Sequence, residues 1–285
     1  MSHQALQRVI VRMLYDPALA DAVIAAPRAA LAGVDLNDAE LGWLTEADPR
    51  AFKTDPYRRA RSLRALLEEY PVSAALSPGR PQQLDRFFSS QRFHAAIQDR
   101  GSMATSFGDW LLAPPERRPE GGFAHPGADA VLQRSPRDAC ALLERAVVRA
   151  RRPERPSLPP AHIAPAPQAV LVRLPAGTLA FYARIRGQLG PAPVAALLSA
   201  DAAVRPPPLL RQQVADATQE ELALVTLTDD EVSVEVAADW LVPLLRHPPA
   251  PRPDWLAAAR DLGADPGEDA ELIDDLIAQA LLISG

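Results

Sequence analysis

The chain of 285 residues is interrupted by a proline-rich stretch, RPERPSLPPAHIAPAPQ, at residues 152–168. Proline lacks the backbone donor that helices and sheets use, and successive prolines favour an extended conformation. A chain of this length exceeds the usual size of a single domain. We therefore expect a first domain over 1–151, a semi-rigid linker over 152–168 and a second domain over 169–285.

The first half carries a repeated signal for the start of a helix. An Asp or Ser directly precedes a proline, so the first side chain can accept a hydrogen bond from a helix amide while the proline fills the first helical position. Asn37 and Glu40 have the spacing of a capping box. Aromatic residues make up only 5% of the chain, and the frequent alanine and leucine favour helix packing. The sequence predicts a helical bundle whose helix starts include Asp16, Asp48, Asp55 and Ser135.

A different pattern follows the proline-rich stretch. Thr228-Asp229-Asp230 is flanked by apolar residues, namely Leu222, Leu224, Val225 and Leu227 before it and Val232, Val234 and Val236 after it. Two such segments with period-two alternation around a short turn are typical of a β-hairpin. Short helices are predicted after it, at about 239–246, 254–262 and 268–282. A hairpin followed by three helices is the order of a winged-helix-like module. The predicted fold is therefore mainly α with a smaller α+β domain.

Several classes of function are disfavoured. The formal charge of −6 does not suit a protein that holds nucleic acid through its overall field. Cys140 is the only cysteine, the five histidines have no metal-binding spacing, and no phosphate loop or hydrolase nucleophile motif is present. The N-terminus is interpreted as an amphipathic helix, and no apolar run is as long as a membrane span. We expect a cytoplasmic protein that has no catalytic centre, metal or cofactor of its own and binds neither nucleic acid nor membranes.

The first candidate site is the stretch from Phe87 to Leu111, where aromatic residues are mixed with small polar ones. Such mixtures occur at protein interfaces. The alternative is that the aromatic residues fill the core of two helices, with Ser89 or Ser102 as helix caps. The candidate partner-interface residues are Arg92, Phe93, His94, Arg100, Ser102, Phe107 and Trp110.

The second candidate site is the hairpin strand from Glu231 to Val236. One face of this strand can pack on the domain while its edge keeps unpaired amides and carbonyls, which an extended peptide can pair with as an added strand. The alternative is an edge covered by the proline-rich stretch. Acidic residues at the start of the last helix would favour a peptide with basic positions. The candidate peptide-binding residues are Val232, Val234 and Val236, with Ile273, Leu276 and Ile277 of the last helix as the opposite wall.

Three segments resemble known families. DPYRRARSLRALLEEYPVSAAL and RFFSSQRFHAAIQDRGSMATSFGDWL resemble the partner subunits of multinuclear non-haem iron oxidases that modify ribosomal peptides, including those of 3-thiaglutamate and methanobactin biosynthesis. The tail, ELALVTLTDDEVSVEVAADWLVPLL to ELIDDLIAQALL, is similar to the peptide-recognition element of such pathways. LYDPALADAVIAAPRAALAGVDLNDAELGWLTEADPRAF resembles the small helical subunit of extradiol dioxygenases.

The resemblance implies an accessory subunit that forms a heterodimer with an iron-dependent oxidase and recruits a ribosomal precursor peptide. In that family the iron ligands belong to the other subunit. The alternative is the small subunit of an extradiol ring-cleavage dioxygenase. A third hypothesis, a winged-helix protein that binds DNA, is disfavoured by the acidic residues Asp269, Glu271, Asp274 and Asp275.

Overall fold

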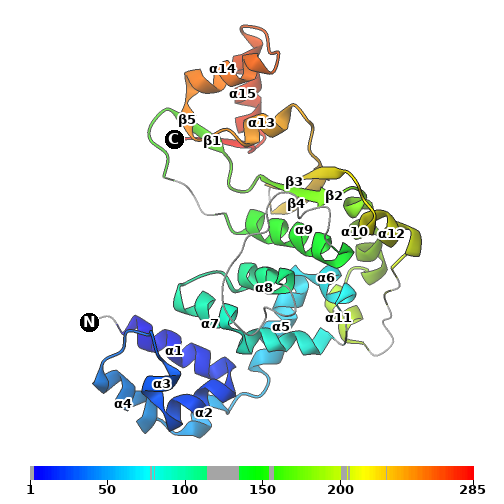
Figure 1. Ribbon diagram of the computed structural model, residues 1–285. Helices are drawn as coiled ribbons and strands as arrows, with labels where there is room; N and C mark the ends of the chain where they lie inside the picture. Colours follow the sequence, from blue (N-terminus) through cyan, green and yellow to red (C-terminus); the bar gives the residue numbers. More distant parts are fainter. Residues whose placement is uncertain are drawn as a thin grey trace. The chain divides into compact units, whose positions relative to one another are not determined.

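The computed structural model describes residues 3–77, 79, 81–113, 135–153, 157–199, 204, 206–228 and 230–285 (Figure 1). The chain forms two compact units. The first comprises Met1–Ala124 and Arg186–Val204, and the second comprises His125–Ile185 and Arg205–Gly285. Most of the regular structure is helical, and the described strands form two small antiparallel sheets, so the prediction of a mainly α chain with a smaller α+β part is confirmed. None of the helices in the described ranges combines the length and the apolar character needed to cross a bilayer.

The first unit is built from short helices. In chain order they are α1 (Gln4–Tyr15), α2 (Pro17–Ala25), α3 (Pro27–Ala30), α4 (Asp38–Glu46), the 3₁₀ helix η1 (Pro49–Phe52), α5 (Arg58–Glu69), α6 (Pro71–Leu76), the 3₁₀ helix η2 (Pro81–Ser89), α7 (Gln91–Gln98), α8 (Met103–Leu112) and α11 (Pro193–Leu198). α11 packs on α5 and α6, so a late segment of the chain completes this unit.

The helix starts follow the predicted capping pattern. The Asp16 carboxylate accepts hydrogen bonds from the amides of Ala18 and Leu19, and Pro17 opens α2. Asn37 and Glu40 form the expected capping box at the start of α4. At Asp55-Pro56 the chain first makes a turn, and α5 begins later, at Arg58. Side chains of Asp48 and Ser135 cap η1 and α9 (Pro136–Arg151) respectively.

The second unit contains the sheet β2 (Val170–Pro175), β3 (Glu220–Thr228) and β4 (Glu231–Val236), with β3 in the middle. The predicted hairpin is present, since β3 and β4 pair from Thr228 and Glu231 to Ala223 and Val236. Asp230 in its turn has a φ of 66°, a conformation that Asp tolerates better than most residues. α10 (Thr178–Leu189) follows β2 and leads into the first unit, and α12 (Pro208–Ala215) precedes β3.

α9 lies on this sheet, although its place before the proline-rich stretch predicted that it belongs to the first domain. Its buried residues Leu143, Ala146 and Val147 share a cluster with Leu174 and Val225 of the sheet. The helix therefore has its apolar face against the second unit, although it precedes the proline-rich stretch in the sequence.

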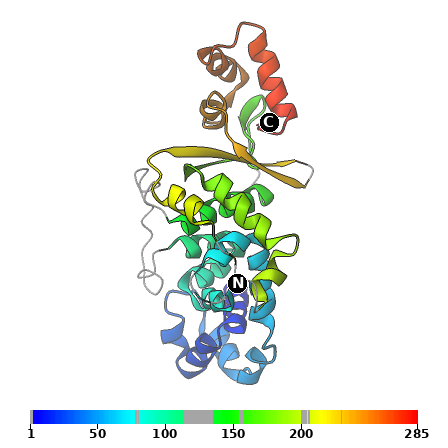
Figure 2. The ribbon, with the colours of Figure 1, turned by 90° about the vertical axis from the view of Figure 1, so that its right-hand side faces the viewer.

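The last part of the second unit has its own small sheet, with β1 (His162–Pro165) between β5 (Ala250–Pro251) and β6 (Leu282–Ser284). Helices α13 (Leu241–Leu245), α14 (Arg252–Asp261) and α15 (Glu268–Ala278) pack around it. β1 falls within residues 152–168, the stretch predicted to be a linker. Figure 2 shows the sheet β2-β3-β4 with green α9 on one side and red α15 on the other.

Candidate functional site

β4 has one edge that no described strand pairs with. In an antiparallel pair, residues alternate between those that bond the neighbouring strand and those whose N–H and C=O point away. The amide of Ala237 donates to the oxygen of Leu222 (2.7 Å), so these two residues form a hydrogen-bonded pair of the β3-β4 ladder. Counting back along β4, every second residue bonds to β3, and the residues between do not. The main-chain groups of Val232, Val234 and Val236 therefore point away from β3, toward the open edge.

The side chains of the same three valines lie on the face of the sheet that α9 covers. Val232 and Val234 are partly buried and pack against the cluster of α9, β2 and β3. Val236, at the end of the strand, is 64% exposed. The edge is therefore held in place by packing on one face, while no described strand pairs with its outward main-chain groups.

The outer edge of β2 is less suited to accept another strand. The amide of Ala176 donates to the oxygen of Gln219 (3.0 Å), so the main-chain groups of Leu171, Arg173 and Pro175 are those that point away from β3, toward the outer edge. Pro175 has no N–H to donate, and proline on an edge strand protects it from pairing. Among the described strands, β4 thus offers this sheet the better edge for strand addition.

The predicted opposite wall lies elsewhere in the second unit. Ile273 and Leu276 are buried with Trp255 in the core of α13–α15, and Ile277 packs against the same core. Val232 and Val234 belong to the separate cluster on α9. Ile273, Leu276 and Ile277 therefore stabilise the module of α13–α15, and the structure does not bring them to the edge of β4.

Two of the acidic residues of α15 also have structural partners. Asp269 is paired with Arg260 (2.6 Å) and Asp274 with Arg252 (2.8 Å), which links α15 to α14. Hydrogen bonds from the amide of Gly267, then from Ala270 and Arg260, outweigh desolvation and lower the pKa of Asp269. These carboxylates complete the packing of the two helices.

The aromatic members of the predicted partner interface lie in the core of the first unit. Phe93 and Phe107 are fully buried, Trp110 is 5% exposed, and their rings contact that of Phe87 at centroid distances between 5.2 and 5.9 Å. Ser102 caps α8 by accepting a hydrogen bond from the amide of Thr105. Of the two interpretations of this stretch, the described packing matches the one in which the aromatic residues fill the core.

The charged members of the predicted interface are more accessible. Arg100 is exposed, with a φ of 57°, and Arg92 is partly buried. His94 Nε2 lies 3.3 Å from Asp16 Oδ2, which joins α7 to the start of α2. Burial raises the pKa of Asp16, but the neighbouring His94 and the hydrogen bonds from the amides of Leu19 and Ala18 outweigh it, so the pKa is lowered overall. His94 thus has a structural partner inside its own unit.

Cys140 lies fully buried in α9. Desolvation and the neighbouring Glu144 raise the pKa of its thiol well above the ordinary value. A thiol in this environment is a poor nucleophile.

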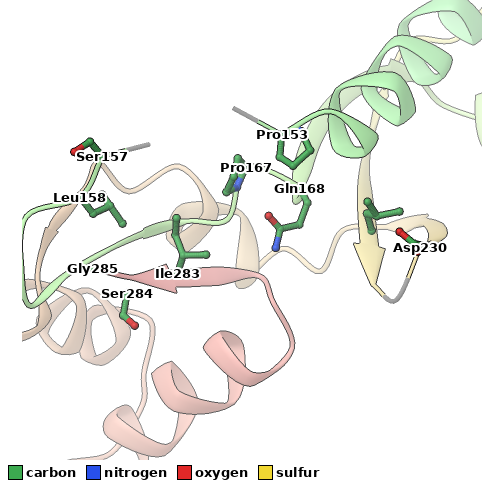
Figure 3. A pocket seen from close by; sticks show the side chains of 10 residues that line it. Pro153, Ser157, Leu158, Pro167, Gln168, Asp230, Ile283, Ser284 and Gly285 are labelled. Carbon is green, nitrogen blue, oxygen red and sulfur yellow. The ribbon is translucent and has the colours of Figure 1, made fainter. Parts of the chain in front are cut away.

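A hollow of about 770 Å³ lies beside the hairpin turn (Figure 3). Segments far apart in the sequence line it, which is why sequence patterns did not indicate it. Ile283 and Ser284 come from β6, and Pro167 and Gln168 connect β1 to β2.

Within the described ranges, no cluster of His, Cys, Asp or Glu has the arrangement of a metal site; His125 lies outside those ranges.

No protein-family model matches this sequence, and a search of curated proteins found none with significant similarity.

Proposed function

We propose that this chain is an accessory subunit that captures an extended precursor peptide on the open edge of β4 and presents it to an iron-dependent oxidase. The observation that carries the proposal is the outward direction of the main-chain groups of Val232, Val234 and Val236. A peptide added as a fourth strand would satisfy these donors and acceptors, as in other β-augmentation complexes.

The rigidity of the edge supports this proposal. β4 is paired with β3 along its whole length, and Val232 and Val234 pack against the α9 cluster. A preformed edge does not have to be ordered when the peptide binds, so less of the binding free energy is lost.

The elements beyond the sheet support a finer description of the second unit as winged-helix-like. α13, β5, α14, α15 and β6 follow one another as helix, strand, helix, helix and strand. β1, from the upstream stretch, occupies the middle of the small sheet between β5 and β6. In this proposal the module of α13–α15 is the scaffold on which the peptide-binding sheet rests, through Leu222 and Leu224 of β3.

An oxidase is proposed as the partner because residues 55–76 and 86–111 resemble known partner subunits. In this proposal the two proteins form a heterodimer, the oxidase supplies the iron ligands, and this chain supplies the peptide. Since the aromatic residues of the second segment are buried, Arg92 and Arg100 are the members of the predicted interface from which contacts would be made.

Peptide capture is tested with a labelled precursor peptide encoded beside this chain, using fluorescence anisotropy. Val234→Pro removes an outward donor without removing a hydrogen bond to β3, so the hairpin should persist and affinity should fall at least about tenfold. Arg173→Pro is the matched control, because it removes an outward donor from the edge of β2. Equal affinity of the wild type and folded Val234→Pro would rule out capture at β4.

The oxidase contact is tested by co-purification with a barrel-type iron oxidase encoded in the same gene neighbourhood. The double variant Arg92→Ala/Arg100→Ala should reduce recovery of the complex while the circular dichroism spectrum stays unchanged. Full recovery with this variant would place the contact on another surface, and failure of the wild type to bind the oxidase would remove that partner from the proposal.

A further inference from the structure

The two faces of β4 differ in chemistry. Its side chains alternate between the face toward α9, with Val232, Val234 and Val236, and the opposite face, with Glu231, Ser233 and Glu235. All three residues of the second group are exposed. The open edge thus separates an apolar row from a row that carries two carboxylates.

Neighbouring carboxylates of the sheet have partners, in contrast to those two. Glu220 lies 3.6 Å from Arg173, and Glu221 accepts hydrogen bonds from the amides of Gly177 and Leu179 at the start of α10. No ion pair is found for Glu231 or Glu235 among the described residues. Their charges are therefore available to a ligand on the edge.

A strand added at this edge would place its own side chains alternately on the same two faces. Directly opposed residues of paired strands have their Cβ atoms about 4.5–5.5 Å apart, close enough for opposite charges to attract. Residues of the added strand beside Glu231 and Glu235 are favoured when they are Lys or Arg. Those beside Val234 and the exposed Val236 are favoured when they are apolar.

Building on the proposed function, we infer that the edge of β4 selects an extended segment in which basic residues alternate with apolar ones. The alternation matters as much as the composition, because a block of basic residues would place half of its charges on the valine face. Main-chain hydrogen bonds hold the segment, and the two carboxylates determine its register and the preference for basic residues at the positions beside them.

The experiment uses the full chain and capped, fluorescently labelled eight-residue peptides. In the first probe, lysine alternates with valine or threonine; the second has the same composition in two blocks; the third has glutamate in place of lysine. Two cross-strand charge pairs correspond to roughly a threefold to tenfold preference for the first probe at low salt. Val234→Pro should abolish binding of all three.

A charge exchange separates local recognition from general attraction. Glu231→Lys/Glu235→Lys should reverse the preference, so that the glutamate probe binds more tightly than the lysine probe. Glu268→Lys/Glu271→Lys is the matched control, because it makes the same change in net charge at exposed positions of α15. The control variant should keep the wild-type order of affinities.

The outcomes distinguish this inference from the proposed function. Equal binding of the three probes that Val234→Pro nevertheless abolishes would overturn the inference and leave peptide capture at β4 intact. A reversal of preference by the α15 variant would also overturn it. If the folded chain bound none of the probes, the inference would fail, while the precursor-peptide assay would still decide the proposed function.

Discussion

The indole Nε1 of Trp255 donates a hydrogen bond of 2.9 Å to the main-chain oxygen of Ile163, 92 residues earlier in the chain. Both residues are buried, Trp255 completely. Ile163 belongs to β1 and Trp255 to α14, so this bond fastens the upstream strand to the module of α13–α15.

Replacing Trp255 by phenylalanine should lower the free energy of unfolding of the second unit by about 1–3 kcal/mol. The change removes a buried hydrogen bond and leaves a small cavity. Urea denaturation followed by circular dichroism measures the loss. Trp240→Phe is the control, since that side chain is 47% exposed and should change stability by less than about 0.5 kcal/mol. A Trp255→Phe protein as stable as the control would contradict the role assigned to the bond.

The amides of β1 should exchange slowly with solvent deuterium, even though they lie in a proline-rich stretch. Ile163 and Ala164 pair with β5 and β6 respectively, and the amide of Ala166 donates to the oxygen of Leu281. Residue-resolved hydrogen exchange checks this, with the outward amide of Val234 as a fast-exchanging internal reference. Exchange of these β1 amides as fast as that of Val234 would show that the segment behaves as a linker in solution.

Gly108→Ala should destabilise the first unit by about 1–3 kcal/mol, because of overpacking. A Cβ at Gly108 would lie 2.8 Å from Cζ of Tyr70, whose hydroxyl donates to the oxygen of Ala104. Gly42→Ala is the matched control, because Gly42 is also helical and, beyond its chain neighbours and the backbone of its own helix, no atom lies within 4 Å of the added Cβ. The control should be stabilised by about 0.5–1 kcal/mol. Thermal unfolding that ranks the two variants the other way would contradict the close packing of Tyr70 on α8.

Asp16→Asn should reduce the loss of unfolding free energy that the protein shows as pH falls. The pKa of Asp16 is lowered in the folded protein, so its charged form stabilises the fold above the ordinary carboxyl pKa, and this contribution is lost as pH falls. Asn remains a good helix cap, so the variant mainly removes the charge, at a cost of about 1–2 kcal/mol near neutral pH. Urea unfolding between about pH 7 and pH 3 should show a smaller decrease for the variant than for the wild type. Parallel pH curves would exclude a stabilising charge at Asp16.

The features predicted correctly from the sequence depend on residues close together in the chain. The capping box of Asn37 and Glu40 needs only a spacing of three, and the hairpin closed by Thr228 and Glu231 needs only alternation around a turn. Both are specified by local hydrogen bonding and side-chain periodicity.

The features that sequence patterns did not predict depend on pairing at long range. β1 contains His162 and Pro165 and looks like part of a linker, yet it pairs with strands that begin at Ala250 and Leu282. Likewise, an aromatic stretch has the same composition whether it forms a core or a surface. Only the packing of Phe93 and Phe107 on other rings distinguishes the two.

The position of β1 determines when its sheet can form during synthesis. β1 leaves the ribosome well before β5, which begins at Ala250, and before β6, which begins at Leu282. Until β5 is made the strand has two open edges, and pairing at this separation along the chain carries a larger loop-closure cost than pairing within a hairpin. We therefore expect the sheet β5-β1-β6 to be the last part of the second unit to fold, after the α9 helix and the β3-β4 hairpin, whose contacts are available earlier.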